Sequence, residues 1–252
     1  MLENKGYGPT LGTCSADPYF CSLAAKYASF TNSHGVSHPS QPNYTAIAAG
    51  STLGCTADNC VGAGAYGNTN LGGQLTDSAT PWVGWMESMP SPCYTGTGSG
   101  GYVLKHNPFV IFKADVTGTC HIQPYPGVVA AVSTLDGANP PDFAWITPNL
   151  IDDMHDGTVQ QGNAWLIANV APILASPWFT KFKSTVIVTM DEGDTGGSNQ
   201  VPTVVISNAA SGTGAVTTSI NHYAVLRAIE ESFGLSLIGG AATAPSIVSL
   251  FG

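Results

Sequence analysis

The sequence predicts a single α/β domain over residues 1–252, without internal repeats. Short runs rich in β-branched and aromatic residues alternate with longer helical patterns, as in sheets covered by helices. A length of 252 residues with 43% hydrophobic content is enough to build one full core. Stretches 54–80 and 91–101 are rich in small polar residues, and we expect them to be surface excursions because the flanking segments continue the core pattern.

Local pattern predicts the individual elements. Buried strands are expected at the short apolar runs, and helices at the longer segments between and after them. A short helix is expected to end at Gly50, because glycine readily adopts the left-handed conformation that closes a helix. In chain order the expected elements are helices over 20–30 and 44–49, strands over 109–112 and 143–146, a helix over 159–174, strands over 185–189 and 202–206, and a helix over 222–233.

Ser40 lies between Pro39 and Pro42, directly ahead of the short helix. Each proline pushes the residue before it toward an extended conformation, so we expect a stiff loop, a helix that begins only after Pro42, and an exposed serine. The free N–H groups at the start of that helix favour an anion such as phosphate. Ser40 is therefore a candidate nucleophile, and an ordinary helix N-cap is the alternative interpretation.

The charge balance excludes some partners. A formal net charge of −9 and the absence of any basic run argue against nucleic-acid binding and against electrostatic docking on anionic membranes. No apolar stretch is long enough to span a bilayer, so we expect no integral membrane association. An acidic chain that handles an anionic group needs a bound cation to supply positive charge, which favours a metal-dependent protein.

Six cysteines lie in the N-terminal half, mostly in loops, and none forms a CxxC pair. An even number of loop cysteines without zinc-ligand spacing favours disulfides and an oxidising compartment. Sequential pairing, 14–21, 55–60 and 93–120, is the simplest of the fifteen possible connectivities. We therefore expect a secreted or periplasmic protein, here in a mature or clipped form because no signal peptide is present.

Asp191 and Glu192 follow the expected strand 185–189, separated from it only by Met190. Ligands gather at the carboxyl ends of strands in α/β sheets, and adjacent carboxylates repel each other unless a cation or proton separates them. These two residues are candidate ligands for a hard metal ion, and Glu3 with Asn4 would add oxygen ligands. The alternative is a solvated acidic turn.

Two histidines precede or follow expected strands. His106 comes just before 109–112, and His155 lies between Asp153 and Asp156, which could orient its ring and raise its pKa. A general acid or a donor to phosphate oxygens uses such an arrangement, although an Asp/His-rich helix cap has the same sequence. For His222, which opens the last helix, capping or packing is the expected role.

Taken together, these segments resemble the bacterial phosphoesterase family of secreted acid phosphatases and phosphatidylcholine-type phospholipases C, a branch of the alkaline-phosphatase-like superfamily. The resemblance runs nearly end to end, and without extra C-terminal domains the chain looks most like the small secreted acid phosphatases. The segments that carry it are 2–7, 38–44, 105–108, 143–156, 191–194 and 222–230.

The resemblance implies a three-layer α/β/α sandwich with a central, mostly parallel sheet and one site at its carboxyl edge. It implies that Ser40 attacks phosphorus while a divalent cation, Mg, Ca or Mn, lowers the pKa of its hydroxyl. The implied metal ligands are Glu3, Asn4, Ser40, Asp191 and Glu192; His106 and His155 steady the phosphoryl oxygens or protonate the leaving group; and Asn43, Asp153 and Gln200 are the implied substrate-binding residues.

The chain departs from the family pattern at two places. The hydrophobic strand that usually precedes the Glu-Asn pair is missing, and Gln200 stands where the family tends to carry histidine, so a proton cannot be shuttled there. The expected function is a secreted metal-dependent acid phosphatase that hydrolyses phosphomonoesters, including phosphoinositide phosphates, through a phosphoserine. Its substrate would be a small-molecule or lipid-headgroup phosphate ester. A phospholipase C-like phosphodiesterase and a catalytically impaired binding protein on the same fold are the alternatives.

Overall fold

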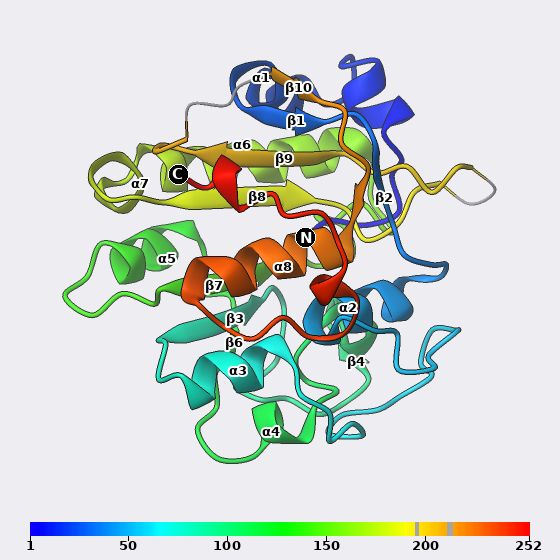
Figure 1. Cartoon of the computed structure of the whole chain (residues 1–252), viewed down its shortest axis with the longest axis vertical. Coiled ribbons are helices and arrows are strands. Elements are labelled where there is room, and N and C mark those ends of the chain that lie inside the picture. Colours follow the sequence, from blue (N-terminus) through cyan, green and yellow to red (C-terminus); the bar gives the residue numbers. More distant parts are fainter. Residues whose placement is uncertain (195–196, 211–213) are drawn as a thin grey trace.

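The computed structural model describes residues 1–194, 197–210 and 214–252. Its strands stack through the middle of the molecule, with helices on both sides of the stack (Figure 1). The helices are α1 (Pro18–Lys26), α2 (Ser40–Ala49), α3 (Leu71–Asp77), α4 (Lys113–Val116), α5 (Val128–Leu135), α6 (Val159–Ala175), α7 (Pro177–Lys181) and α8 (His222–Phe233). The strands are β1 (Ala28–Phe30), β2 (Ser33–His34), β3 (Trp82–Met86), β4 (Gly98–Ser99), β5 (Tyr102–Val103), β6 (Ile122–Pro124), β7 (Phe143–Thr147), β8 (Thr185–Thr189), β9 (Thr203–Ser207), β10 (Gly214–Val216) and β11 (Ile220–Asn221).

Two groups of strands build the stack, in the orders β10-β1-β9-β8 and β6-β3-β7. Strand β3 runs parallel to both β6 and β7, whereas β9 runs antiparallel to both β1 and β8. Strand β1 also pairs in parallel with β10, so the arrangement is mixed, with parallel pairs in both groups and the antiparallel pairs around β9. The α/β class predicted from the sequence is confirmed.

The first residues of the chain lie between these two groups of strands. Leu2 N donates to Thr189 O at 2.9 Å, and Asp191 N donates to Leu2 O at 3.0 Å, so this segment pairs with the end of β8. On the other side, the Met1 ammonium donates to Ile146 O of β7 at 2.7 Å. Although no long strand precedes Glu3, its backbone is held at the carboxyl ends of β7 and β8.

Alternate residues of β9 face opposite helical layers. Val204 and Ile206 pack in one buried cluster with Leu166 and Val170 of α6. Val205 packs in another cluster with residues of α8. Because successive strand residues point to opposite faces, α6 and α8 cover the two sides of the sheet, giving the expected three layers.

Five of the expected elements are confirmed: 143–146, 159–174, 185–189, 202–206 and 222–233 correspond to β7, α6, β8, β9 and α8. The helix predicted over 20–30 is wrong in its second half, because Tyr27 has an extended backbone and ends α1, and 28–30 form the buried strand β1. Its three residues are all buried, so the segment lacks the alternation of buried and exposed residues that marks a half-exposed strand.

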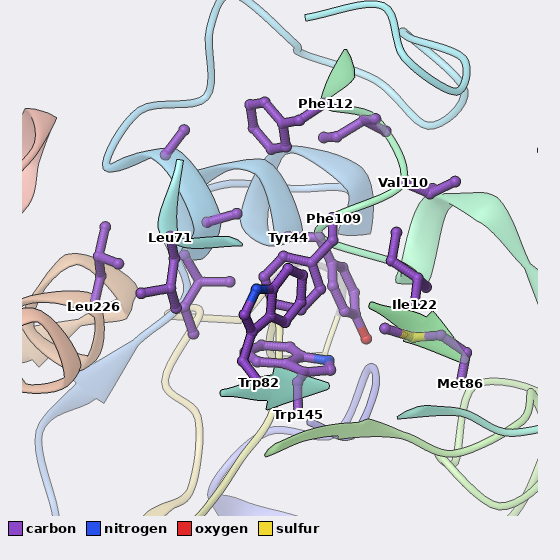
Figure 2. Close-up of a cluster of buried hydrophobic side chains, with 14 of the residues drawn as sticks. Tyr44, Leu71, Trp82, Met86, Phe109, Val110, Phe112, Ile122, Trp145 and Leu226 are labelled. Atoms are coloured by element: carbon purple, nitrogen blue, oxygen red, sulfur yellow. The ribbon is translucent and has the colours of Figure 1, made fainter. Parts of the chain in front are cut away.

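The strand predicted over 109–112 is a buried turn instead. Asn107 Oδ1 accepts hydrogen bonds from Phe109 N and Val110 N, each at 3.1 Å, which folds the backbone back on itself. The run is apolar because it fills the core: Figure 2 shows Phe109, Val110 and Phe112 around Tyr44 and its neighbours.

The loop around Ser40 also differs from the prediction. Helix α2 begins at Ser40 itself and ends at the left-handed Gly50, so Pro42 lies in the first turn. A proline is tolerated there, because N–H groups in the first turn have no partner within the helix. Ser40 is only 1% exposed, so the prediction of an exposed serine is wrong.

All three predicted disulfides, Cys14–Cys21, Cys55–Cys60 and Cys93–Cys120, are present. Within the described ranges, no helix has both the length and the apolar character needed to cross a membrane.

Candidate active site

The candidate site lies where the start of the chain, the end of β8 and the N-terminus of α2 meet. Ser40 Oγ donates a hydrogen bond to Glu3 Oε2 at 2.9 Å and lies 3.3 Å from Glu192 Oε1. Asn4 N donates to Asp191 Oδ1 at 3.1 Å. The predicted metal-ligand residues therefore come together, although they belong to three distant segments.

Asn43 holds the loop that leads into α2. Its Oδ1 accepts from Val36 N at 2.8 Å and Ser37 N at 3.0 Å, and its Nδ2 donates to Ser37 O and Pro39 O at 2.9 and 3.1 Å. The side chain is fully buried, and its polar atoms are engaged with this loop. In the structure Asn43 shapes the loop that leads to Ser40.

Four acidic side chains gather around Ser40 and His106, and all four are buried: Glu3, Asp153, Asp191 and Glu192. Burial raises the pKa of Glu3 well above its usual range, and the nearby carboxyls of Asp191 and Asp153 raise it further. Burial, with Glu192 adding to it, raises the pKa of Asp191 to about 8. Negative charge is thus costly here in the absence of a cation.

The carboxylate of Asp191 bears most directly on whether the cluster fits a cation. Its Oδ2 is buried and has no hydrogen-bond partner within the described part of the chain. Burial leaves such an oxygen with an uncompensated desolvation cost unless a cation or a proton meets it. The oxygen-rich donor set fits a hard divalent cation.

His106 lies on the opposite side of Glu3. Its Nδ1 is 3.1 Å from Asp153 Oδ2, and its Nε2 is 3.2 Å from Glu3 Oε2 without forming a hydrogen bond. Burial lowers the pKa of His106 well below its usual range, so the ring is neutral. When Nδ1 carries the ring proton and donates it to Asp153 Oδ2, the lone pair of Nε2 faces Glu3.

Glu3, His106 and Asp153 each offer a ligand atom, and these atoms lie within 4.8 Å of one another. The residues can therefore hold a metal ion, and Glu3 is shared with the predicted ligand set. From the sequence, other roles were expected for His106 and Asp153, because nothing in the local pattern shows that they meet Glu3.

His155 stands nearer the surface, beside His106. Its ring centre is 5.2 Å from that of His106, and its Nδ1 is 2.7 Å from Asp156 Oδ1, the predicted orienting contact. Asp153 contacts the His155 backbone nitrogen instead of the ring, at 2.7 Å. The His155 side chain is partly accessible.

Sequence reasoning did not assign roles to two site neighbours, His38 and Lys105. His38 Nδ1 contacts Glu192 Oε2, and Lys105 Nζ lies 3.1 Å from His155 Nε2. In the sequence, the available indication of a site role is that His38 precedes Pro39 and Lys105 precedes His106.

Two further predicted residues contact backbone groups. His222 Nε2 lies 2.5 Å from Asp191 O, and burial lowers the pKa of His222 to about 4, so the neutral ring braces the turn after β8. That agrees with the packing role expected for it. Gln200 Nε2 donates to Thr31 O at 2.7 Å, away from Ser40.

Solved structures establish the type of fold. A protein of the alkaline phosphatase superfamily from Vibrio parahaemolyticus superposes with a TM-score of 0.60 at 12% identity, covering 93% of this chain and 65% of that one. The lipoteichoic acid synthase LtaP from Listeria monocytogenes gives a TM-score of 0.65 at 10% identity, covering 97% and 74%. The fold is that of the alkaline phosphatase superfamily.

The particular family follows from the sequence match. The model of the phosphoesterase family matches residues 13–236, and the chain belongs to this family of phosphoric-ester hydrolases.

Curated relatives include a phosphatidylinositol-3-phosphatase from Mycobacterium tuberculosis, 34% identical over 99% of this chain. A phosphate-repressible acid phosphatase from Penicillium chrysogenum is 30% identical over 94% of it, and an acid phosphatase from Aspergillus fumigatus is 29% identical over 94%. The chain spans 80% of the length of the first relative, and 58% and 54% of the other two.

Proposed function

We propose that the protein is a metal-dependent phosphomonoesterase of the acid phosphatase type that works through a phosphoserine on Ser40. The observation that carries this proposal is the contact of a buried serine hydroxyl with Glu3 and Glu192, beside the unpartnered oxygen of Asp191. The names of the curated relatives support hydrolysis of monoesters.

The cation would be held by Glu3, Asn4, Asp191 and Glu192 together with the Ser40 oxygen. When bound, a Mg, Ca or Mn ion supplies Lewis acidity that favours the serine alkoxide and offsets charge on the phosphoryl group. His106 and Asp153 lie against Glu3 and keep its carboxylate oriented.

In the first step, Ser40 Oγ attacks phosphorus and the bond from phosphorus to the leaving oxygen breaks. Glu3 Oε2, at 2.9 Å, is the nearest acceptor for the hydroxyl proton. His155 is placed to give a proton to the departing alkoxide, since it is the more accessible of the two neighbouring histidines. In the second step, water attacks the phosphoserine and gives a proton to His155, the bond from phosphorus to Ser40 Oγ breaks, and Glu3 returns its proton to the Ser40 oxygen as phosphate leaves.

The physiological substrate would be a small-molecule or lipid-headgroup phosphate ester. The relative from Mycobacterium tuberculosis supports phosphoinositide phosphates as one class. Three disulfides support action in a secreted or periplasmic compartment, because such bonds persist under oxidising conditions.

Paired assays test the proposal. The protein is incubated with Mg, Ca or Mn and given 4-nitrophenyl phosphate or 4-nitrophenyl phosphorylcholine. Faster turnover of the monoester, lost on chelation and restored by metal, is the expected result. Preference for the choline diester would instead indicate a phospholipase C-like enzyme. Phosphate binding without turnover of either ester would indicate a binding protein.

A further inference from the structure

Glu87 directly follows strand β3, at the carboxyl edge of the sheet. Its backbone N donates to the O of Thr147, the last residue of β7, at 2.9 Å. Glu87 and His106 line the same cavity, whose volume of about 10 Å³ is the space of a single water molecule. A half-buried carboxylate therefore lies next to the candidate site, although the proposed mechanism does not use it.

The side chain of Glu87 holds the start of the loop over residues 149–156. Its Oε2 accepts a hydrogen bond from Asn149 N at 3.0 Å. Asn149 in turn organises the next residues of the loop, because its Oδ1 accepts from Ile151 N at 3.0 Å and from Asp152 N at 3.2 Å. The carboxylate of Glu87 thus fixes where this loop leaves the sheet.

Asp153 connects the loop to three parts of the site. Its backbone N donates to Asn149 O at 2.8 Å, and its backbone O accepts from Glu3 N at 2.7 Å. Its Oδ1 accepts from His155 N at 2.7 Å, and its Oδ2 contacts His106 Nδ1 at 3.1 Å. A shift of Asn149 would therefore move Asp153, and with it the backbone of His155.

The residue between Asp153 and His155 needs such an anchor, because its backbone is strained. Met154 has a φ of +80°, in the left-handed region that residues with a Cβ rarely adopt. Its side chain is fully buried and lies so close to Gly162 of α6 that a Cβ there would approach Met154 Cε to 2.1 Å. A strained residue keeps its conformation only where the surrounding contacts hold it. Here Glu87 holds the loop from one side and α6 from the other.

The ring of His155 has contacts of its own. Its Nδ1 is 2.7 Å from Asp156 Oδ1, and its Nε2 is 3.1 Å from Lys105 Nζ. Lys105 also donates to Asp58 Oδ2 at 2.7 Å, inside the loop closed by the Cys55–Cys60 disulfide. These contacts orient the ring, whereas its distance from a bound ester depends on the backbone that carries it.

We propose that Glu87 is a positioning residue that sets the place of His155 for protonation of the leaving group. It acts through Asn149 and Asp153, by accepting a hydrogen bond and not by its charge. The proposal rests on the phosphomonoesterase function above, in which His155 gives a proton to the departing alkoxide, and it adds the support that this proton donor needs. A shift of about 1 Å in a catalytic group can lower a rate about a hundredfold.

The test compares benzyl phosphate with 4-nitrophenyl phosphate, two esters whose aromatic groups are similar in size. The alkoxide of benzyl alcohol needs a proton as it leaves, whereas 4-nitrophenolate leaves without one near neutral pH. Glu87→Ala should lower kcat/KM about tenfold or more for benzyl phosphate and less than about threefold for 4-nitrophenyl phosphate. General damage to the fold or to the metal site would slow both esters alike. Equal losses on both esters, or no loss on either, would overturn the proposal.

Two conservative variants separate reach from charge. Glu87→Gln keeps an oxygen that can accept from Asn149 N, and it should retain most of the parental kcat/KM for benzyl phosphate. Glu87→Asp keeps the charge but is shorter by one methylene, so it should show the selective loss, and it replaces Glu87→Ala as the test if a thermal melt shows that Ala unfolds the protein. Asp142→Ala, which removes an exposed carboxylate at the opposite end of β7, is the matched control and should change neither ester. A loss in Glu87→Gln as large as that in Glu87→Asp would overturn the proposal.

A double variant tests whether Glu87 acts through His155. His155→Ala should slow benzyl phosphate selectively, and adding Glu87→Ala to it should cause no further loss for that ester. A further selective loss in the double variant would overturn the role of Glu87 and leave the proposed function intact. If His155→Ala slows both esters alike, His155 is not the proton donor, and that part of the proposed function fails together with the role of Glu87.

Discussion

The Ser40 hydroxyl lies 2.9 Å from the Glu3 carboxylate, although 37 residues separate them in the chain. The contact exists because Leu2 pairs with the end of β8, which sets Glu3 at the carboxyl edge of the sheet. Tyr44, one turn into α2, donates from its hydroxyl to Glu3 Oε1 at 2.5 Å while its ring packs in the core (Figure 2). Ser40, the proposed nucleophile, and its acidic partner Glu3 are thus both anchored in well-packed structure.

Replacing Ser40 by Ala should abolish turnover and leave the fold intact. The change removes one hydroxyl, whereas loss of a covalent nucleophile lowers kcat by several orders of magnitude. Steady-state kinetics and a thermal melt are the measurements, with the exposed Ser91→Ala as control. Activity near the parental level in Ser40→Ala would remove Ser40 from the mechanism.

Asp191→Asn should weaken metal binding and activity together. A hard cation prefers a charged carboxylate oxygen, and the neighbouring ligands cannot replace that charge. Calorimetric titration with Mn²⁺ should show weaker binding, and activity should partly return at high metal concentration. Asp142→Asn, at an exposed position, is the control. A parent enzyme that keeps full activity in the presence of chelators would contradict this prediction.

The free energy of unfolding should fall as pH rises from about 4 to 7, because of the buried carboxyl of Asp115. Its carboxyl is buried against Gly72 in the first turn of α3, and burial raises its pKa to about 7. The unfolded chain loses this proton near pH 4, and the folded protein keeps it, so increasing pH in this range favours unfolding. The full effect is on the order of 4 kcal/mol.

Urea unfolding at several pH values measures this effect. Asp115→Asn should flatten the pH dependence between 4 and 7 and raise stability at neutral pH, whereas Asp142→Asn should leave the parental slope. An unchanged slope in Asp115→Asn would show that Asp115 is not the group responsible.

Reduction of the disulfides should lower the melting temperature before it damages the chemistry. Closing the small Cys55–Cys60 loop contributes about 2 kcal/mol in the chain-entropy account, and the longer Cys93–Cys120 loop contributes somewhat more. Thiol titration of the denatured, unreduced protein should find no free thiol. Six free thiols would contradict both the pairing and the secreted location.

The parts of the fold that were predictable are those with a long local pattern. Helix α6 and strand β8 have enough consecutive residues to show their type, and each cysteine pairs with its neighbour in the order of the six cysteines. Segments 28–30 and 109–112 were not predictable, because both are apolar for reasons of burial alone. An apolar sequence shows that a segment belongs to the core, but it does not determine whether the backbone there is helical, extended or turned.

The acidic members of the site could be predicted because Asp191 and Glu192 follow a clear strand. The burial of Ser40 could not, since it depends on how Glu3 and Glu192 close over the start of α2. Nor could the pairing of Lys105 with Asp58, which depends on where a disulfide loop packs. Contacts between loops distant in sequence leave no periodic signal in either one.

Trapping the covalent intermediate tests the central claim most directly. The enzyme is mixed with a phosphomonoester labelled in its phosphoryl group, quenched in acid within the first turnover, digested and analysed by mass spectrometry. We expect the phosphoryl group on the peptide that contains Ser40, and no labelled peptide from Ser40→Ala. Steady hydrolysis by the parent with the label on another residue, or on none, would contradict the phosphoserine mechanism.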